Sequence, residues 1–137
     1  MKKLNVILVY NQSEEKILMC KRQKEPYKGM LNLVGGKVEP DEDESYAAYR
    51  ELEEETGITK DDIILFHVMN FQYKISNIEL EVFAGKLNKN VSLKEEANPL
   101  CWIDKNENFF DMDKFAGEGN IGHMIEQVKF YKEKLFN

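Results

Sequence analysis

Apolar residues gather in short stretches along the chain, and polar or glycine-containing segments separate them. The length of these stretches and their content of Val, Ile, Leu, Phe and Tyr are typical of β-strands. The expected strands are, in chain order, residues 4–10, 16–22, 31–34, 63–73, 78–87 and 100–103. Ser76 and Asn77 separate the fourth strand from the fifth, which predicts a hairpin turn.

One internal segment has helical signals instead. Asp41, with Glu44 three residues later, predicts a capped helix start, and Gly57 predicts a left-handed stop. The apolar stripe expected to face the core consists of Ser45, Ala48, Tyr49, Leu52 and Thr56. Near the C-terminus a second helix is predicted by helical spacing of Ile121, Met124, Ile125, Val128 and Leu135. Residues 109–115 are expected to form a short helical turn.

Strands that alternate with two helices predict an α/β (α+β) fold, in which helices cover a mixed β-sheet on both faces. The chain has 137 residues, of which 42% are hydrophobic and 32% charged, so we expect one domain over residues 1–137. No apolar run approaches the roughly 20 residues of a membrane helix. Asn5 interrupts the first apolar run, which therefore fits a strand better than a signal peptide. We expect a soluble, cytoplasmic protein.

The net charge and the cysteine content limit the classes of molecule that the protein could bind. The formal net charge is −6, and the sequence lacks the basic footprint of a protein that binds polymeric nucleic acid. An acidic protein can still bind a small polyanion when a divalent metal lies between them, so a metal-assisted small substrate is favoured. Cys20 and Cys101 are expected to be reduced thiols. His67 and His123 are too scattered to suggest a zinc site.

The internal helix carries the candidate chemistry. At about 100° per residue, Glu51, Glu54 and Glu55 share one face, and like charges there cost a helix roughly 0.2–0.5 kcal/mol per pair. A divalent cation would convert this repulsion into attraction, and magnesium binds carboxylates together with substrate phosphates. Arg50 lies four residues before Glu54 and is expected to pair with it. Ala47 lies one turn earlier, where its small side chain would leave room for a ligand.

The spacing of the fixed positions extends this pattern. Over 23 residues the chain reads Gly36, five residues, Glu42, seven residues, Arg50-Glu51-Leu52, one residue, Glu54-Glu55, one residue, Gly57-Ile58. This pattern resembles the Nudix box at every fixed position. The order of the expected strands and helices is also similar to the Nudix fold, so the resemblance covers the whole chain.

The resemblance implies a hydrolase that binds magnesium, or manganese, and cuts a phosphoanhydride bond in a nucleoside diphosphate derivative. The implied metal ligands are Glu51, Glu54, Glu55 and the carbonyl of Gly36. Arg50 would orient the glutamates, and Glu42 and Gly57 would shape the loops around the helix. The general base would be Glu54 or Glu51 within the box, or else Glu96 outside it, where Glu96 would also bind metal. Glu95 is the alternative to Glu96.

The sequence indicates the reaction more narrowly than the substrate. Residues 29–38 are similar to the MutT-like branch that includes 8-oxo-dGTP diphosphatases, in which an asparagine at the position of Asn32 contacts the base. Arg22 and Lys37 are candidates for binding phosphate. Residues 109–115 depart from the Trp-Pro-Asp-Asp segment of that branch, so preference for an oxidised base is open. The leading hypothesis is a nucleoside triphosphate pyrophosphohydrolase. The alternatives are a Nudix enzyme for a nucleotide sugar, dinucleotide or pterin triphosphate, and a non-catalytic nucleotide-binding regulator. A monomer and a homodimer both remain open.

Overall fold

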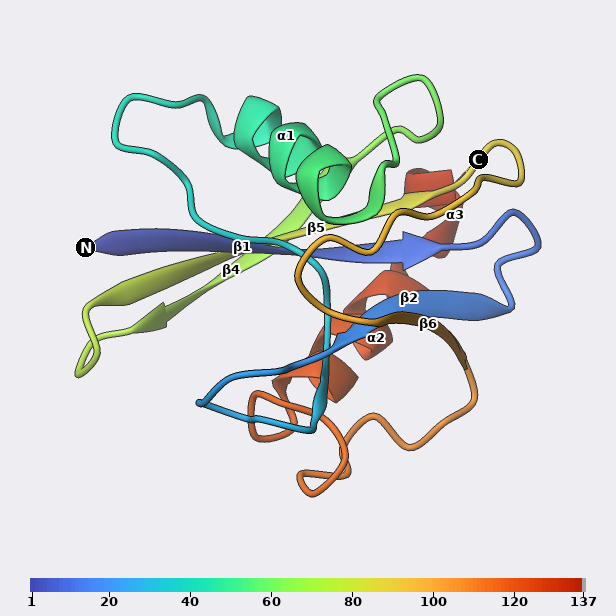
Figure 1. The fold of residues 1–137 in the computed structure, drawn as a ribbon. Coiled ribbons are helices and arrows are strands. Elements are labelled where there is room, and N and C mark those ends of the chain that lie inside the picture. Colours follow the sequence, from blue (N-terminus) through green and yellow to red (C-terminus); the bar gives the residue numbers. More distant parts are fainter. Residues whose placement is uncertain (137) are drawn as a thin grey trace.

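The computed structural model describes residues 1–136 and has one mixed sheet with helices on both faces (Figure 1). The elements are β1 Lys2–Tyr10, β2 Lys16–Lys21, β3 Leu31–Asn32, α1 Glu44–Thr56, β4 Phe66–Tyr73, β5 Ile78–Lys86, β6 Leu100–Asp104, α2 Asn120–Phe130 and α3 Lys132–Phe136. The sheet order is β3-β2-β1-β5-β4, and β6 pairs with β2. The predicted mixed α+β class is confirmed. None of these helices is long and apolar enough to cross a membrane.

The two faces of the sheet have separate cores, as the alternation of side chains along a strand requires. On one face, α1 packs over Ile7, Val9 and Phe83. On the other, α2 packs over residues that include Leu8 and Val82. Figure 1 shows α1 and α2 on opposite sides of β1.

Helix α1 begins later than predicted. Asp43, not Asp41, is the N-cap, and its carboxylate accepts a hydrogen bond from the Tyr46 amide at 3.1 Å. Ser45 was expected in the core but is exposed, because the buried face of α1 is centred on Ala47, Ala48, Leu52 and Thr56. Ala47 is fully buried, so its side chain does not face an open site as predicted. The predicted stop at Gly57 is confirmed, with φ 81°.

Other elements also differ in extent from their predictions. The third strand ends at Asn32, since Val34 leaves it and bridges Ile7 of β1. Residues 109–115 form turns, one of which has the helical spacing that was predicted, since the Phe115 amide donates to the Asp111 carbonyl at 3.0 Å. The C-terminal helix breaks at Tyr131, where φ is −107° and ψ 16°, so α2 and α3 are separate. The hairpin between β4 and β5 is confirmed, and Asn77 adopts a φ of 57° in its turn.

The position of the glycine-containing loop follows from a split in the sheet. Strands β1 and β2 share one registered pair, Tyr10 with Ile17, and then diverge, so that this edge of β2 pairs with β3 at Cys20 and Lys21. Strand β6 pairs with the opposite edge of β2. Residues 34–38 fill part of this opening and run beside β1. The Ile7 amide donates to the Val34 carbonyl at 2.8 Å, and the Asn5 amide donates to the Gly36 carbonyl at 2.8 Å. The loop that precedes α1 is thus fixed to a central strand.

Glu81 on β5 is a buried carboxyl group beneath the start of α1. Its side chain is fully buried, it lies in register with Asn5, and neither oxygen accepts a hydrogen bond within the described chain. Burial, together with the neighbouring Glu44 carboxylate, raises the pKa of Glu81 to about 7. Between about pH 4.5 and 7, the folded protein therefore holds a proton on Glu81 that the unfolded chain releases.

We predict that Glu81→Gln raises the melting temperature at pH 8 by a few degrees. A raised folded-state pKa contributes stability that is complete below the unfolded pKa and is lost as pH rises through about 7. Glutamine keeps the site neutral, so its advantage should shrink towards pH 5. Thermal unfolding at both pH values, with Glu79→Gln as the same-strand control, measures this difference. An equal or lower melting temperature for Glu81→Gln at pH 8 would contradict the prediction.

Candidate functional site

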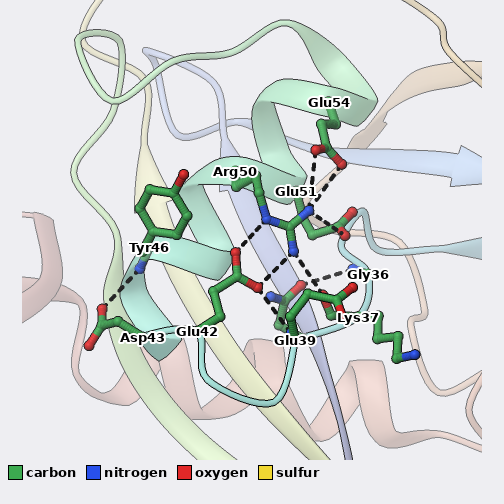
Figure 2. Close-up of polar contacts among 10 residues, drawn as sticks. Gly36, Lys37, Glu39, Glu42, Asp43, Tyr46, Arg50, Glu51 and Glu54 are labelled. Atoms are coloured by element: carbon green, nitrogen blue, oxygen red, sulfur yellow. Dashed lines mark hydrogen bonds and ion pairs between the residues drawn. The ribbon is translucent and has the colours of Figure 1, made fainter.

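The Arg50 guanidinium on α1 is the centre of a network of ion pairs (Figure 2). It contacts both carboxylate oxygens of Glu42, at 2.5 and 2.9 Å, and donates to the Lys37 carbonyl at 3.0 Å. It also reaches Glu51 and Glu54, each at 3.1 Å. The hydrogen bond from Arg50 lowers the pKa of Glu42 to about 2. The predicted pair of Arg50 with Glu54 is present, and the same guanidinium joins α1 to the preceding loop.

Gly35 and Gly36 lie between two of the box carboxylates. The Gly36 amide donates to the Asn5 side-chain oxygen at 2.9 Å, and a Cβ atom on Gly36 would overlap the Glu51 carboxylate. The Gly35 amide donates to Glu55 at 3.2 Å. A side chain at position 36 would displace the Glu51 carboxylate, whereas glycine is required at position 35, where a Cβ atom would meet the Asn5 backbone carbonyl. Glu51 and Glu55 therefore approach the loop backbone from the helix.

Glu55 and Glu54 have opposite environments. Burial is the main reason why the pKa of Glu55 rises to about 7, and the Gly35 amide works against this rise. The Glu54 side chain is 58% exposed and points towards Arg50. Within residues 1–136 no three His, Cys, Asp or Glu side chains are gathered closely enough to hold a metal ion. Glu51 and Glu55 thus lie against the loop, whereas Glu54 pairs with Arg50.

A cavity of about 750 Å³ opens beside this loop. Its lining includes Arg22, Asn32, Gly36, Lys37 and Glu55, so the three predicted substrate-binding residues share one cavity with a box carboxylate. The volume lies within the range of roughly 300–1,000 Å³ common for small-molecule sites. This cavity is the candidate site for substrate.

The predicted substrate-binding side chains are held in different ways. Arg22 follows β2, and its Nε donates to the Pro26 carbonyl at 2.7 Å. The Asn32 side-chain oxygen accepts a hydrogen bond from the Leu33 amide at 2.8 Å, so its amide nitrogen keeps its donors. Lys37 is exposed, and its carbonyl is held by Arg50.

Glu96 is exposed in the loop before β6, and the cavity lining includes its neighbour in sequence Asn98 but not Glu96 itself. Its neighbour Glu95 accepts a hydrogen bond from the Leu100 amide at 2.7 Å, which fixes the entry into β6.

Several cavity residues were not predicted from the sequence. The Asn5 side-chain oxygen accepts a hydrogen bond from the Gly36 amide. The sequence signal for Asn5 was that a polar residue interrupts the first apolar run. The far part of the cavity contains Tyr27, Tyr73, Glu118 and Asn120. Glu118 and Asn120 lie in a glycine-rich segment, residues 117–122, whose composition is typical of a loop that can line a cleft. Tyr73 could stack on a base, although aromatic residues in strands are more often part of the core, and Tyr27 had no local signal.

Comparison with known proteins shows to which family the chain belongs. A model of the NUDIX domain matches residues 1–123. The chain is 41% identical over 59 residues to a CTP pyrophosphohydrolase of Escherichia coli K12, covering 42% of this chain and 44% of that protein. It is 45% identical over 47 residues to an ADP-ribose pyrophosphatase of Methanocaldococcus jannaschii, covering 34% of this chain and 28% of that protein. The matched regions thus span less than half the length of both relatives.

A solved structure shows the same fold over nearly the whole chain. The Caenorhabditis elegans Ap4A hydrolase in a binary complex superposes with a TM-score of 0.76, covering 96% of this chain and 99% of that one, at 19% identity. The family model spans the sheet, helix α1 and the start of α2, including every fixed position of the box. This protein belongs to the Nudix family.

Proposed function

We propose that the chain is a divalent-metal-dependent pyrophosphohydrolase that converts a nucleoside triphosphate to a nucleoside monophosphate and pyrophosphate. The observation that carries this proposal is the placement of Glu51 and Glu55 against Gly35–Gly36, beside a cavity that also holds Arg22 and Lys37. Carboxylates next to basic side chains suit a substrate whose phosphates bind partly through a cation.

The residues fit a hard divalent ion in their chemistry. Nudix hydrolases generally use such ions, typically magnesium. The box supplies carboxylate oxygens from Glu51, Glu54 and Glu55 and the carbonyl oxygen of Gly36, the oxygen donors that magnesium prefers. Glu96 is the predicted ligand from outside the box. A bound ion would neutralise phosphate charge and act as a Lewis acid on the phosphorus centre.

The protein's own groups would position the substrate and move the proton. Arg22 and Lys37 would bind phosphate oxygens as cationic donors. Glu54 or Glu51 would accept the proton of the attacking water as general base. Arg50 fixes the orientation of both carboxylates, and Glu42 fixes Arg50 in turn. The intact set of box glutamates argues against a non-catalytic regulator.

The proposal also concerns which nucleobase the substrate carries. A purine edge could be read by the amide of Asn32, as in the MutT-like branch, and an oxidised purine triphosphate is a candidate substrate. The local similarity to a CTP pyrophosphohydrolase adds a pyrimidine triphosphate to the candidates. The similarity to an ADP-ribose pyrophosphatase supports a nucleoside diphosphate derivative as the second candidate class.

The proposal predicts turnover of at least one nucleoside triphosphate with magnesium. Pyrophosphate and phosphate release would be measured on the canonical and 8-oxo nucleoside triphosphates, ADP-ribose, a nucleotide sugar and a dinucleoside polyphosphate. Pyrophosphate release from a triphosphate is the expected result. Turnover of only the other diphosphates would replace the proposed substrate, and no turnover at all would favour a binding module.

A second prediction concerns Glu54. Glu54→Gln removes a charge at nearly constant shape, so turnover should fall by about 100-fold or more while the melting temperature changes little, since the side chain is exposed. Glu53→Gln is the matched control on the same helix and should retain activity. Near wild-type activity of Glu54→Gln would refute its assigned role.

A third prediction concerns the glycine beside Glu51. The added methyl of Gly36→Ala would occupy the space of the Glu51 carboxylate. We expect affinity for Mn²⁺, measured by calorimetry without substrate, to fall about tenfold or more. Activity of the wild type should be lost with a chelator and restored by magnesium. Unchanged Mn²⁺ affinity in the folded variant would contradict the placement of the ion beside Gly36.

A further inference from the structure

A second polar contact in the cavity involves residues that lie outside the box in the sequence. The Tyr27 hydroxyl donates to a Glu118 carboxylate oxygen at 2.5 Å. Tyr27 lies in the loop after β2, and Glu118 lies just before α2, so the contact joins residues 91 positions apart. Both residues line the cavity. The hydrogen bond therefore fixes a carboxylate at the cavity wall.

The backbone at both residues is in an unfavourable conformation for side chains with a Cβ. Tyr27 has a φ of 68° and Glu118 a φ of 52°. Non-glycine residues rarely adopt the left-handed region, and such strain persists where surrounding contacts enforce it, often at ligand sites. Two strained residues that meet through one hydrogen bond indicate a built contact between the two loops.

Glu118 gives this corner of the cavity a hydrogen-bond acceptor. Beside it, the Asn120 side-chain amide donates to the Tyr73 hydroxyl, which keeps its own proton. Glu118 raises the pKa of Tyr27 to about 12, so that hydroxyl keeps its proton and uses it on Glu118. An ionised carboxylate offers about four lone-pair sites, and Tyr27 occupies one. Glu118 is left with capacity to accept from a ligand.

Resting on the proposed function, we propose that Glu118, held by Tyr27, is a specificity-determining residue that accepts a hydrogen bond from an exocyclic amino group of the substrate base. The substrate class is then a nucleoside triphosphate with an amino-bearing base. A base with a carbonyl oxygen at the same position would direct a lone pair at the carboxylate. That arrangement loses a charge-assisted hydrogen bond and adds repulsion between like partial charges.

Two pairs of substrates isolate this contact. CTP and UTP differ in an amino group against a carbonyl at position 4, with the accompanying change of protonation at N3, and GTP and ITP differ in the amino group at position 2. For at least one pair, kcat/KM should favour the amino-bearing member about tenfold or more, mainly through KM. A larger factor is not expected, because Glu118 is exposed.

Variants of the contact should change this ratio and not the overall rate alone. Glu118→Gln replaces an acceptor-only group by an amide that also donates, so the amino preference should fall about tenfold or reverse. Tyr27→Phe, which frees the carboxylate to move, should reduce the preference less. Glu107→Gln, a surface carboxylate that pairs with Lys114, is the matched control and should leave the ratio unchanged. Melting temperatures establish that each variant is folded.

The outcomes separate this inference from the proposed function. If triphosphates are hydrolysed without an amino preference, or with one that folded Glu118→Gln and Tyr27→Phe both retain, Glu118 does not determine specificity and the proposed function stands. If Glu118→Gln does not fold, the ratio in Tyr27→Phe decides. If no triphosphate is hydrolysed, the proposed function fails, and this inference fails with it.

Discussion

The Arg50 guanidinium joins two segments that would otherwise be independent, the loop before α1 and the outer face of α1. Its five donors reach Glu42, the Lys37 carbonyl, Glu51 and Glu54. A planar guanidinium is suited to this because its donors point in fixed directions. Without it, three carboxylates would repel one another, and the loop would lack an anchor on the helix. The same contacts fix the orientations of the Glu51 and Glu54 carboxylates.

The second constraint is the opening between β1 and β2. A continuous sheet would place β2 against β1 along its whole length and would leave no space for the loop. Because β2 instead diverges from β1 after Ile17 and pairs with β3 on that edge, residues 34–38 can bond to β1. Asn5 can then support Gly36 with both its backbone and its side chain. The cavity that holds Arg22, Asn32 and Lys37 lies beside the same opening. The fold thus produces the candidate site as a consequence of strand pairing.

The cavity is chemically divided. Basic side chains and the box carboxylate Glu55 lie near the glycines, where an ion and phosphates would be accommodated. The tyrosines, Glu118 and Asn120 line the other part of the cavity, where the Glu118 carboxylate favours a group that donates a hydrogen bond. One cavity can in this way combine residues that serve the chemistry common to a family with residues that select one member's substrate. The two sets lie in different segments of the chain.

The sequence by itself determined the mixed fold and the members of the box, because strand periodicity, the stop at Gly57 and the spacing of Arg50 from Glu54 are local properties. It misplaced the start of α1, since Asp41 and Asp43 compete for the same capping role. Only the tertiary structure decided that Glu51 packs on Gly36, that Glu96 stays outside the cavity, and that Tyr27 meets Glu118. These relations join segments far apart in the chain, and their geometry depends on how the strands pair and where the sheet opens, which no local pattern of residues encodes.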